Sequence, residues 1–272
     1  MKIDVATEKI IIIKDQISDR DAEATAWDKK VSAFGTISQV AGFFARPKDE
    51  DFELVYSEHR YEPFWHVLAK ARYVYDRKAT YKVPVSGNVV KSATLLNTDF
   101  EVSSDHLHLD VMEHCVQDEM DEVFIDGITA KNITSLASYT NYSHTEVKGK
   151  IENSIAKNSL VVPPSARISA IMRDSLSKMI KGIQADVIHE EHVEVSIVEL
   201  YYHPIYAYKF RWNSKAKEGI IEVDGVTGEV RSGARVFSEY LGKVLDQDFL
   251  FDIGADAAGM MVPGGSIAVK AA

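Results

Sequence analysis

Hydrophobic and polar residues alternate with a period of two from Phe52 to Val85, a segment rich in Tyr, Val and Phe. This period is typical of strands that have one buried and one exposed face. The turn-forming residues Asp76-Arg77-Lys78 and the proline at position 84 interrupt the pattern. We therefore predict an antiparallel meander over residues 52–85, preceded by a strand over residues 8–14.

Two other segments have the three- and four-residue spacing of helices with one apolar face. The first starts at Ser18 or Asp19, either of which can cap a helix N-terminus, and its apolar side reaches Phe34. The second follows Pro163-Pro164 and is expected to be a helix as well. Its apolar stripe is formed by Ile168, Ile171, Met172, Leu176, Met179, Ile180 and Ile183.

Alternation returns after the second helical segment. It predicts strands at 192–202 and 204–213, then a turn at Asn213-Ser214, a strand at 219–224 and a turn at Asp224-Gly225. The second half of the chain therefore follows the plan of the first half, in which a helix precedes antiparallel strands.

The two halves also match around a proline, Pro63 in the first and Pro204 in the second, with the alternating run before each proline in the same register. The other matched positions are Phe52, Tyr61, Trp65, Lys70, Arg72, Gly87 and Val90 in the first copy, and Val193, Tyr202, Tyr206, Arg211, Trp212, Gly228 and Val230 in the second. Such repetition predicts the duplication of a small folding unit, and it says more about architecture than about chemistry.

Each half is best explained by a helix that lies across one face of a curled antiparallel sheet, because both elements have a single apolar face to cover. We therefore predict an α+β protein of two diverged repeats, each a helix packed on such a sheet, with an inserted linking segment. The predicted units are a first repeat over 1–96, a linking subdomain over 97–160, a second repeat over 161–253 and a Gly/Ala-rich C-terminal tail over 254–272.

The last predicted hairpin, residues 219–230, ends in an Asp-x-x-Thr-Gly-x-Val turn that begins at Asp224. This hairpin resembles that of PepSY-type domains, whereas the matched stretch of the first repeat, residues 84–90, lacks the Asp and the Thr. Turn chemistry also explains Gly225 and Gly228, because tight turns need residues that accept a positive φ. The resemblance implies a small regulatory or inhibitory module rather than a catalytic one.

Composition narrows the class of protein. The net charge of −10 and the pI near 5.4 oppose binding to nucleic acid, which clustered Lys and Arg normally recognise. The apolar run Ile10–Ile13 is far shorter than the roughly 20 residues of a membrane span and lacks the form of a signal peptide. We therefore predict a cytoplasmic protein without integral membrane insertion. The single cysteine, Cys115, excludes an intrachain disulfide.

The best candidate for chemistry is the segment 105–115, which contains three imidazoles, three carboxylates and a thiol. On a strand, His106 and His108 point to the same side and can reach one divalent cation, with His114 returning from a following turn. An alternating polar strand on a solvated face explains the same pattern, and no familiar metal-site spacing is present. A divalent metal therefore remains one of two readings of this segment.

Three other groups are candidates of lower rank. His189 and His192 are best explained by a polar junction between a helix and a strand. Aromatic residues alternate with Lys and Arg in both repeats, which favours a sheet with aromatics in the core and cations on the exposed face. Met260, Met261 and Val262 in the tail belong either to a mobile end or to a segment that contacts a partner.

These patterns leave three functional hypotheses. We expect a non-enzymatic cytosolic protein-binding or assembly component, with a protein partner or a homo-oligomer, in which exposed sheet edges, loops or the tail make the contacts. The alternative is a metal-dependent hydrolase that uses His106, His108 and His114, with Glu113 as the base. A small-ligand pocket between helix and sheet is the third hypothesis.

Overall fold

The computed structural model describes residues 1–35, 47–232 and 269–271. The strands are β1 (Lys2–Val5), β2 (Lys9–Ile13), β3 (Phe52–Pro84), β4 (Ser92–Leu95), β5 (Thr98–Ser103), β6 (His106–Asp126), β7 (His144–Glu146), β8 (Leu160–Val161), β9 (Val187–Trp212), β10 (Lys217–Asp224), β11 (Val230–Ser232) and β12 (Val269–Ala271). The helices are α1 (Asp19–Lys29) and α3 (Ile168–Met179), with short 3-10 helices η1 (Lys30–Phe34), η2 (Asp49–Asp51), η3 (Thr134–Asn141), η4 (Ile151–Asn153) and η5 (Asn213–Lys215).

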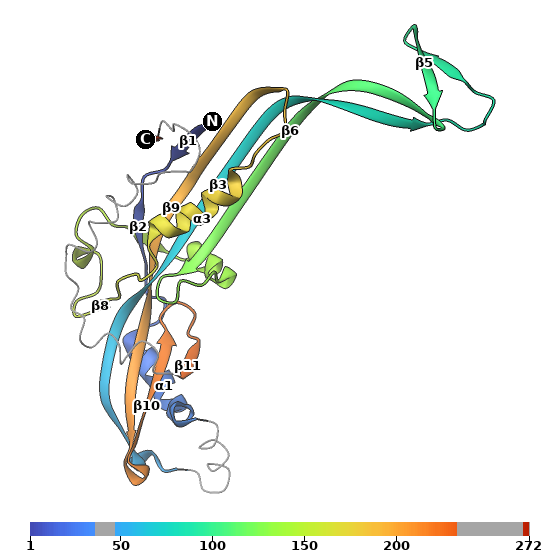
Figure 1. Ribbon diagram of the computed structural model, residues 1–272. Coiled ribbons are helices and arrows are strands. Elements are labelled where there is room, and N and C mark those ends of the chain that lie inside the picture. The colour runs from blue at the N-terminus through green and yellow to red at the C-terminus, as the bar shows by residue number, and fades with distance from the viewer. Residues whose placement is uncertain (36–46, 233–268, 272) are drawn as a thin grey trace.

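Three long strands form the spine of an elongated molecule (Figure 1). β3 pairs antiparallel with β9 on one side and with β6 on the other, and β10 and β11 extend the sheet beyond β9. β2 runs parallel to the middle of β9, and β8 runs parallel to the middle of β3. The described strands therefore join into one mixed sheet rather than into two separate ones.

The two matched prolines meet at the middle of the β3–β9 pair, where Pro63 lies opposite Tyr202, two residues from Pro204. Each proline lies in the first strand of a strand pair, β3–β6 or β9–β10, and its carbonyl accepts a hydrogen bond from the glycine that follows the second strand. The N–H of Gly127 donates to Pro63 O at 2.9 Å, and the N–H of Gly225 donates to Pro204 O at 2.9 Å. The ends of both hairpins are thus fixed to the centre of the sheet by the same contact.

Both glycines belong to Asp-Gly-x-Thr turns with the same internal hydrogen bonds. In each turn the Asp Oδ1 accepts from the backbone N–H groups two and three residues later, at 3.0 and 2.6 Å for Asp126 and at 2.8 and 2.9 Å for Asp224. The sequence pattern paired the turn at Asp224 with residues 84–90. The turn that shares its geometry is the one at Asp126.

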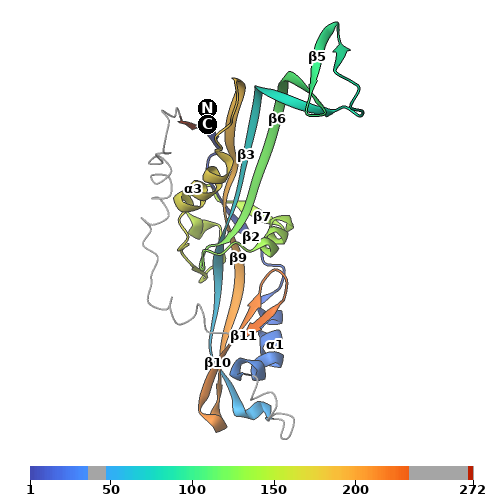
Figure 2. The ribbon, with the colours of Figure 1, turned by 45° about the vertical axis from the view of Figure 1, so that its right-hand side comes forward.

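Each helix covers the hairpin of the other half of the chain. α1 follows Ile17, whose N–H donates to Gly225 O at 3.1 Å, and it packs on β9 and β10. α3 follows Ala166, whose N–H donates to Gly127 O at 3.2 Å, and it packs on β3, β6 and β9. Figure 2 shows the two helices toward opposite ends of the body. The halves are therefore intertwined.

The predicted α+β architecture of two helix-on-sheet repeats is wrong, because strands dominate the fold and a shared sheet crosses both halves. The predicted turn at Asp76–Lys78 is also wrong, since these residues lie inside β3 and pair with β6. Cross-strand pairing satisfies their backbone groups and outweighs their local turn preference. The antiparallel sheet, the Ser18 cap of α1 and the helix at α3 are confirmed.

β3 and β6 continue as a two-stranded ribbon beyond the start of β9, which lies opposite Asp76. The β4–β5 hairpin lies at the outer end of this ribbon. We call residues 77–113 the arm and the rest of the described chain the body. Figures 1 and 2 show the arm projecting away from the body in both views.

The predicted boundaries can be placed on this fold. The boundary after residue 96 falls between β4 and β5 at the outer end of the arm. β6 belongs to the predicted linking subdomain and pairs over its whole length with β3 of the first repeat. Of the predicted tail 254–272, the described strand β12 pairs in parallel with β1.

Candidate functional site

One face of the arm is apolar and half exposed. The cross-strand pairs on this face are Ala79 with Val111, Tyr81 with Leu109, and Val83 with Leu107. They continue the side of the sheet that α3 covers, because strand side chains alternate and Tyr75 belongs to the core under α3. Tyr81 is 50% exposed and Val83 is 40% exposed. The face that forms the core of the body is therefore open to solvent on the arm.

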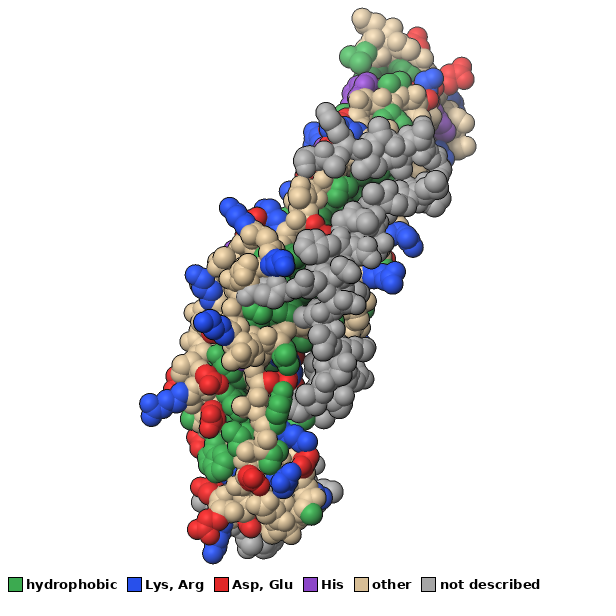
Figure 3. Space-filling view, turned by 90° about the vertical axis from the view of Figure 1, so that its left-hand side faces the viewer, with side chains coloured by type: hydrophobic (Ala, Val, Ile, Leu, Met, Phe, Trp, Pro, Cys, Tyr) green, Lys and Arg blue, Asp and Glu red, His purple; other side chains and the backbone are tan. Residues whose placement is uncertain are grey.

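Apolar side chains also mark the outer end of the arm. Leu96 and Asn97 form the turn between β4 and β5, both with positive φ, and Leu96 is 91% exposed. A non-glycine residue in this region costs about 1–2 kcal/mol, and hairpin turns of this kind normally use Asn, Asp or Gly. Leu95 is exposed next to it, and Val89, which precedes β4, is exposed as well. In Figure 3, hydrophobic side chains lie among charged ones over this end of the molecule.

The outer edge of β6 is unpaired over most of its length in the described structure. β5 pairs with its first residues, and the segment from Lys131 to Ile133 bonds to its last ones. At that end Phe124 O accepts from the N–H of Ile133 at 2.8 Å, away from β3. Because backbone direction alternates along an antiparallel strand, the even-numbered residues 108–122 direct both N–H and C=O outward.

This edge strand is strongly acidic. β6 contains seven Asp and Glu residues and no Lys or Arg. Neighbouring cations contact some of them, as between Arg72 and Asp118 at 2.8 Å and between Lys181 and Glu119 at 2.6 Å. These pairs are exposed, so each contributes only about 0–1 kcal/mol to stability. Acidic side chains on an open edge oppose pairing with another copy of the same strand.

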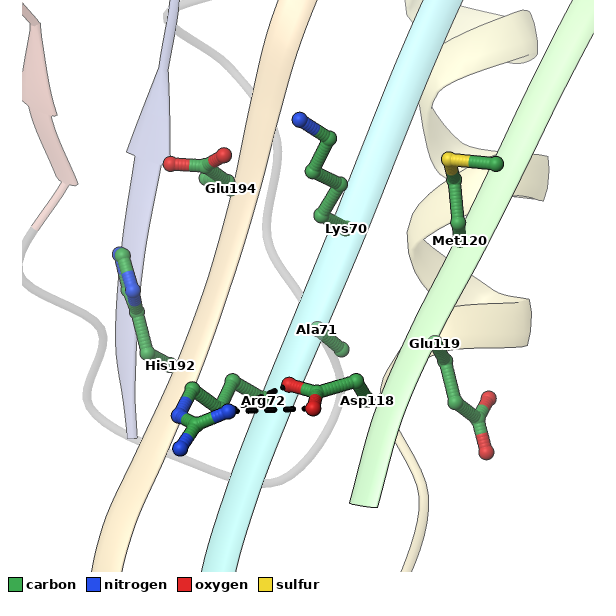
Figure 4. A pocket seen from close by; sticks show the side chains of 8 residues that line it. All are labelled: Lys70, Ala71, Arg72, Asp118, Glu119, Met120, His192 and Glu194. Atoms are coloured by element: carbon green, nitrogen blue, oxygen red, sulfur yellow. Dashed lines mark hydrogen bonds and ion pairs between the residues drawn. The ribbon is translucent and has the colours of Figure 1, made fainter. Parts of the chain in front are cut away.

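The open face of the sheet, opposite α3, contains a shallow cavity of about 410 Å³ (Figure 4). Its lining residues are Lys70, Ala71, Arg72, Asp118, Glu119, Met120, His192 and Glu194. Arg72 lies between Asp118 and Glu190, at 2.8 and 3.3 Å. Small-molecule sites are lined mainly by hydrophobic side chains with a few polar groups, whereas most residues around this cavity are charged. The arrangement suits contacts with a polar surface.

The three histidines of the predicted metal site lie along β6 without converging. His106 Nδ1 contacts Ser104 O at 2.7 Å, and His114 Nδ1 contacts Asp76 at 2.7 Å. Eight residues of strand place these two histidines about 26 Å apart. The turn that would have brought His114 back is absent because β6 continues through it. In the described residues no group of three possible ligands could hold a metal ion.

Asp76 instead collects two imidazoles at the base of the arm. His189 Nε2 approaches its other carboxylate oxygen at 2.8 Å, so the contact links β3, β6 and β9. Hydrogen bonds from His189 and His114 hold the pKa of Asp76 below its usual range. His189 and His192 both lie within β9, and the junction predicted there is part of the strand. Met260, Met261 and Val262 lie outside the described residues.

A buried ionic cluster occupies the middle of the body, and the sequence interpretation missed it. Arg60, only 1% exposed, donates to Glu62 at 2.7 Å, to Glu58 at 2.8 Å and to Glu222. Arg231 closes the cluster with bonds to Glu62 at 2.7 Å and to Glu222 at 2.6 Å. The sequence signal was the period-two charge pattern of Glu58, Arg60 and Glu62 within a predicted strand.

The charges in this region are closely matched. Burial alone would raise the pKa of Glu62, but the Arg231 and Arg60 guanidinium groups hold it below its usual range. The pKa of Asp224 is also lowered against the effect of burial, by nearby His203 and by a hydrogen bond from Tyr139. Glu62 and Asp224 both have hydrogen-bond donors within reach, so neither leaves an uncompensated charge at the centre of the sheet.

The comparisons with known proteins give no relative. No family model matches the chain, and neither the curated proteins nor the solved structures contain a match. The resemblance of residues 219–230 to a PepSY-type hairpin therefore stays a prediction. No helix in the described ranges is long and apolar enough to cross a membrane.

Proposed function

We propose that this protein is a protein-binding or assembly component and that the arm is the part that contacts its partner. The observation that carries this proposal is the exposed apolar face of a two-stranded ribbon that extends past its third strand. The body has its own buried core and does not use this face. An apolar surface in such a position is best explained by a contact with another protein.

The physical argument starts from the stability of the ribbon. An isolated two-stranded hairpin is marginally stable in water, because it has no second layer to cover its apolar face. Full burial of an aliphatic or aromatic side chain contributes about 1.5–3 kcal/mol. A partner that covers Tyr81, Val83 and their neighbours would therefore both order the arm and gain affinity.

The turn at Leu96 supports the same conclusion. Leu96 is almost fully exposed and has a positive φ, so it lowers local stability while its side chain buries little surface against the described chain. Asn or Gly at this position would remove the strain. A leucine here is explained if its side chain enters a pocket of the partner, since buried apolar anchors dominate many protein interfaces.

The test is crosslinking of the purified, full-length protein to an extract of its source cells, followed by mapping of the crosslinked peptides. Lys82 and Lys91 on the arm provide the reactive amines. We expect crosslinks from these lysines to one protein partner. The double substitution Leu95→Asn and Leu96→Asn should reduce their yield by about tenfold or more, since two apolar anchors are lost.

A matched control is Leu160→Asn, which removes an exposed leucine of the body that is 46% accessible. It should leave the crosslinks unchanged. If the crosslinks map to the body, or if the tip substitutions leave the yield unchanged, the arm is not the contact surface and the proposal is wrong. Circular dichroism of each variant confirms that the sheet is retained.

A further inference from the structure

We infer that the outer edge of β6 binds a cationic extended segment of the partner, which adds to the sheet as a further strand. This inference rests on the proposed function, because it names the chemistry of the partner that the arm would contact. Strand addition to an exposed edge is a common mode of peptide recognition, in which backbone hydrogen bonds supply affinity and alternate side chains supply specificity.

The geometry of the edge supports a long strand. β5 and the segment 131–133 occupy only the two ends of β6, so the described structure leaves the stretch between them open. The outward N–H and C=O groups of residues 108–122 belong to eight even-numbered residues. An added segment would find a continuous row of unpaired donors and acceptors, bounded at both ends.

Charge decides which segment can bind there. The seven carboxylates of β6 have no lysine or arginine among them. A second copy of β6 would place acidic residues near acidic residues, and like charges across a strand pair are destabilising. A segment that carries lysine or arginine instead meets opposite charges along the edge.

The two faces of β6 specify the pattern of that segment. Near the arm, the even positions place Asp110 on the open face, and its carboxylate contacts the Thr80 hydroxyl at 2.7 Å. The odd positions Leu107, Leu109 and Val111 lie on the apolar face. Residues directly opposite each other share a face. Along the arm, the best partner is therefore an alternating segment with cations on the face of Asp110 and apolar residues opposite Leu107, Leu109 and Val111.

This arrangement makes a specific prediction about backbone hydrogen bonds. We place the added strand antiparallel to β6, as β3 is on the other side of β6. In an antiparallel strand, the residues that face even-numbered β6 positions direct their own N–H groups to β6, so these are the cationic residues. N-methylation of the cationic residues would remove the donors at the interface. N-methylation of the apolar residues would leave these donors in place, because their N–H groups point to the other side.

The experiment uses fluorescent peptides of about ten residues that alternate Lys and Val, a length within that of an ordinary strand. Anisotropy titrations with the full-length protein should show binding of the Lys-Val peptide and no binding of a Glu-Val peptide. The peptide with N-methyl-lysine should bind about tenfold or more weakly, whereas the peptide with N-methyl-valine should keep its affinity.

A protein variant tests the same bonds from the other side. Met112→Pro removes an outward N–H from the edge without removing a bond to β3, and proline is tolerated on edge strands. Met112→Pro should lower the affinity for the Lys-Val peptide, whereas Met112→Thr, which keeps the N–H, should leave that affinity unchanged. Circular dichroism and unfolding curves of both variants establish that the fold is intact.

Equal binding of both N-methylated peptides, or unchanged affinity of Met112→Pro, would show a nonspecific charge contact and overturn the inference. Absence of Lys-Val binding would overturn it as well. Neither result affects the crosslinking test at Leu95 and Leu96, which reports on the tip of the arm and not on the edge of β6. If only the peptide-binding test at the β6 edge fails, the proposed function still holds. If the substitutions of Leu95 and Leu96 leave the crosslinks unchanged, the proposed function is wrong.

Discussion

The β9–β10 and β3–β6 hairpins start from the same arrangement and end differently. In both, a proline carbonyl accepts a hydrogen bond from the glycine N–H of an Asp-Gly-x-Thr turn. Both also pack under a helix from the other half of the chain. β10 has eight residues, all within the body, whereas β6 has 21 residues and continues into the arm. The arm is therefore an addition to a hairpin whose structural role is already complete at its base.

This comparison separates stability from function. Charges and apolar groups at the centre of the body are buried and matched, as in the Arg60 cluster. Charges and apolar groups on the arm and its edge are exposed and only partly paired. Substitutions in the body should therefore affect the free energy of unfolding, whereas substitutions on the arm should affect binding.

The largest expected difference is in the free energy of unfolding, between an arginine substitution in the body and one on the arm. Arg60→Met should lower the free energy of unfolding by about 3–5 kcal/mol, because it leaves buried carboxylates without their guanidinium partner. Arg77→Met removes an exposed partner of Glu113 on the arm and should cost about 1 kcal/mol or less. Urea unfolding curves measure both values. Similar costs at the two sites would contradict the division between body and arm.

The two Asp-Gly-x-Thr turns should differ in a second way. Asp224 accepts a hydrogen bond from Tyr139 and lies 3.7 Å from His203 Nδ1, in addition to its turn bonds. Asp224→Asn should therefore lower stability at neutral pH by about 1.5–3 kcal/mol, as expected for hydrogen bonds to a charged group. Asp126→Asn is the matched control and should cost less, because the amide oxygen can keep the turn bonds.

The lowered pKa of Asp224 adds a pH dependence to this prediction. A carboxyl group whose pKa is lower in the folded than in the unfolded state stabilises the fold at pH values above its unfolded pKa of about 3.9. This contribution is lost progressively as the pH falls from that value through the lower pKa of the folded state. The urea midpoint of the wild type should therefore drop below about pH 5 more steeply than that of Asp224→Asn. Parallel profiles would show that the Asp224 contacts are not coupled to folding.

The smallest expected difference concerns the two turn glycines. A Cβ at position 127 would lie 2.7 Å from Pro63 O, whereas a Cβ at position 225 would lie 3.0 Å from Pro204 O. Gly127→Ala should therefore cost about 1–3 kcal/mol, and Gly225→Ala should cost less, because its neighbours need to move less. Thermal unfolding of the two variants tests this order, and the reverse order would show that the first turn adapts more easily.

Local patterns predicted much of the secondary structure. The Ser18 cap, the apolar stripe of α3 and the strand β10 follow from short-range signals, and the structure contains each of them. The two strands predicted over 192–202 and 204–213 are one continuous strand, β9. The sequence pattern failed at Asp76–Lys78, where it predicted a turn but the residues lie inside β3 and pair with β6. It also failed for the metal hypothesis, because an unbroken β6 keeps His106 and His114 apart.

The candidate site was less predictable than the fold. Exposed sheet edges were named as contact surfaces, but nothing in the sequence showed that β3 and β6 extend past β9. That property depends on where β9 begins relative to Asp76, which is a register between residues more than a hundred positions apart. The open edge of β6 depends on a different pairing, because β5 pairs only with the first two residues of β6.

The sequence by itself determined the elements that depend on neighbouring residues, namely the alternating strands, the Ser18 cap of α1, the apolar stripe of α3 and the glycine turns, together with the acidic charge of β6. The tertiary structure decided which strands pair, which helix covers which hairpin and where the third strand stops. These choices arise from contacts between distant residues, whose burial and hydrogen bonds exist only after the chain has folded. The arm, its apolar face and its open edge are consequences of that second set of choices.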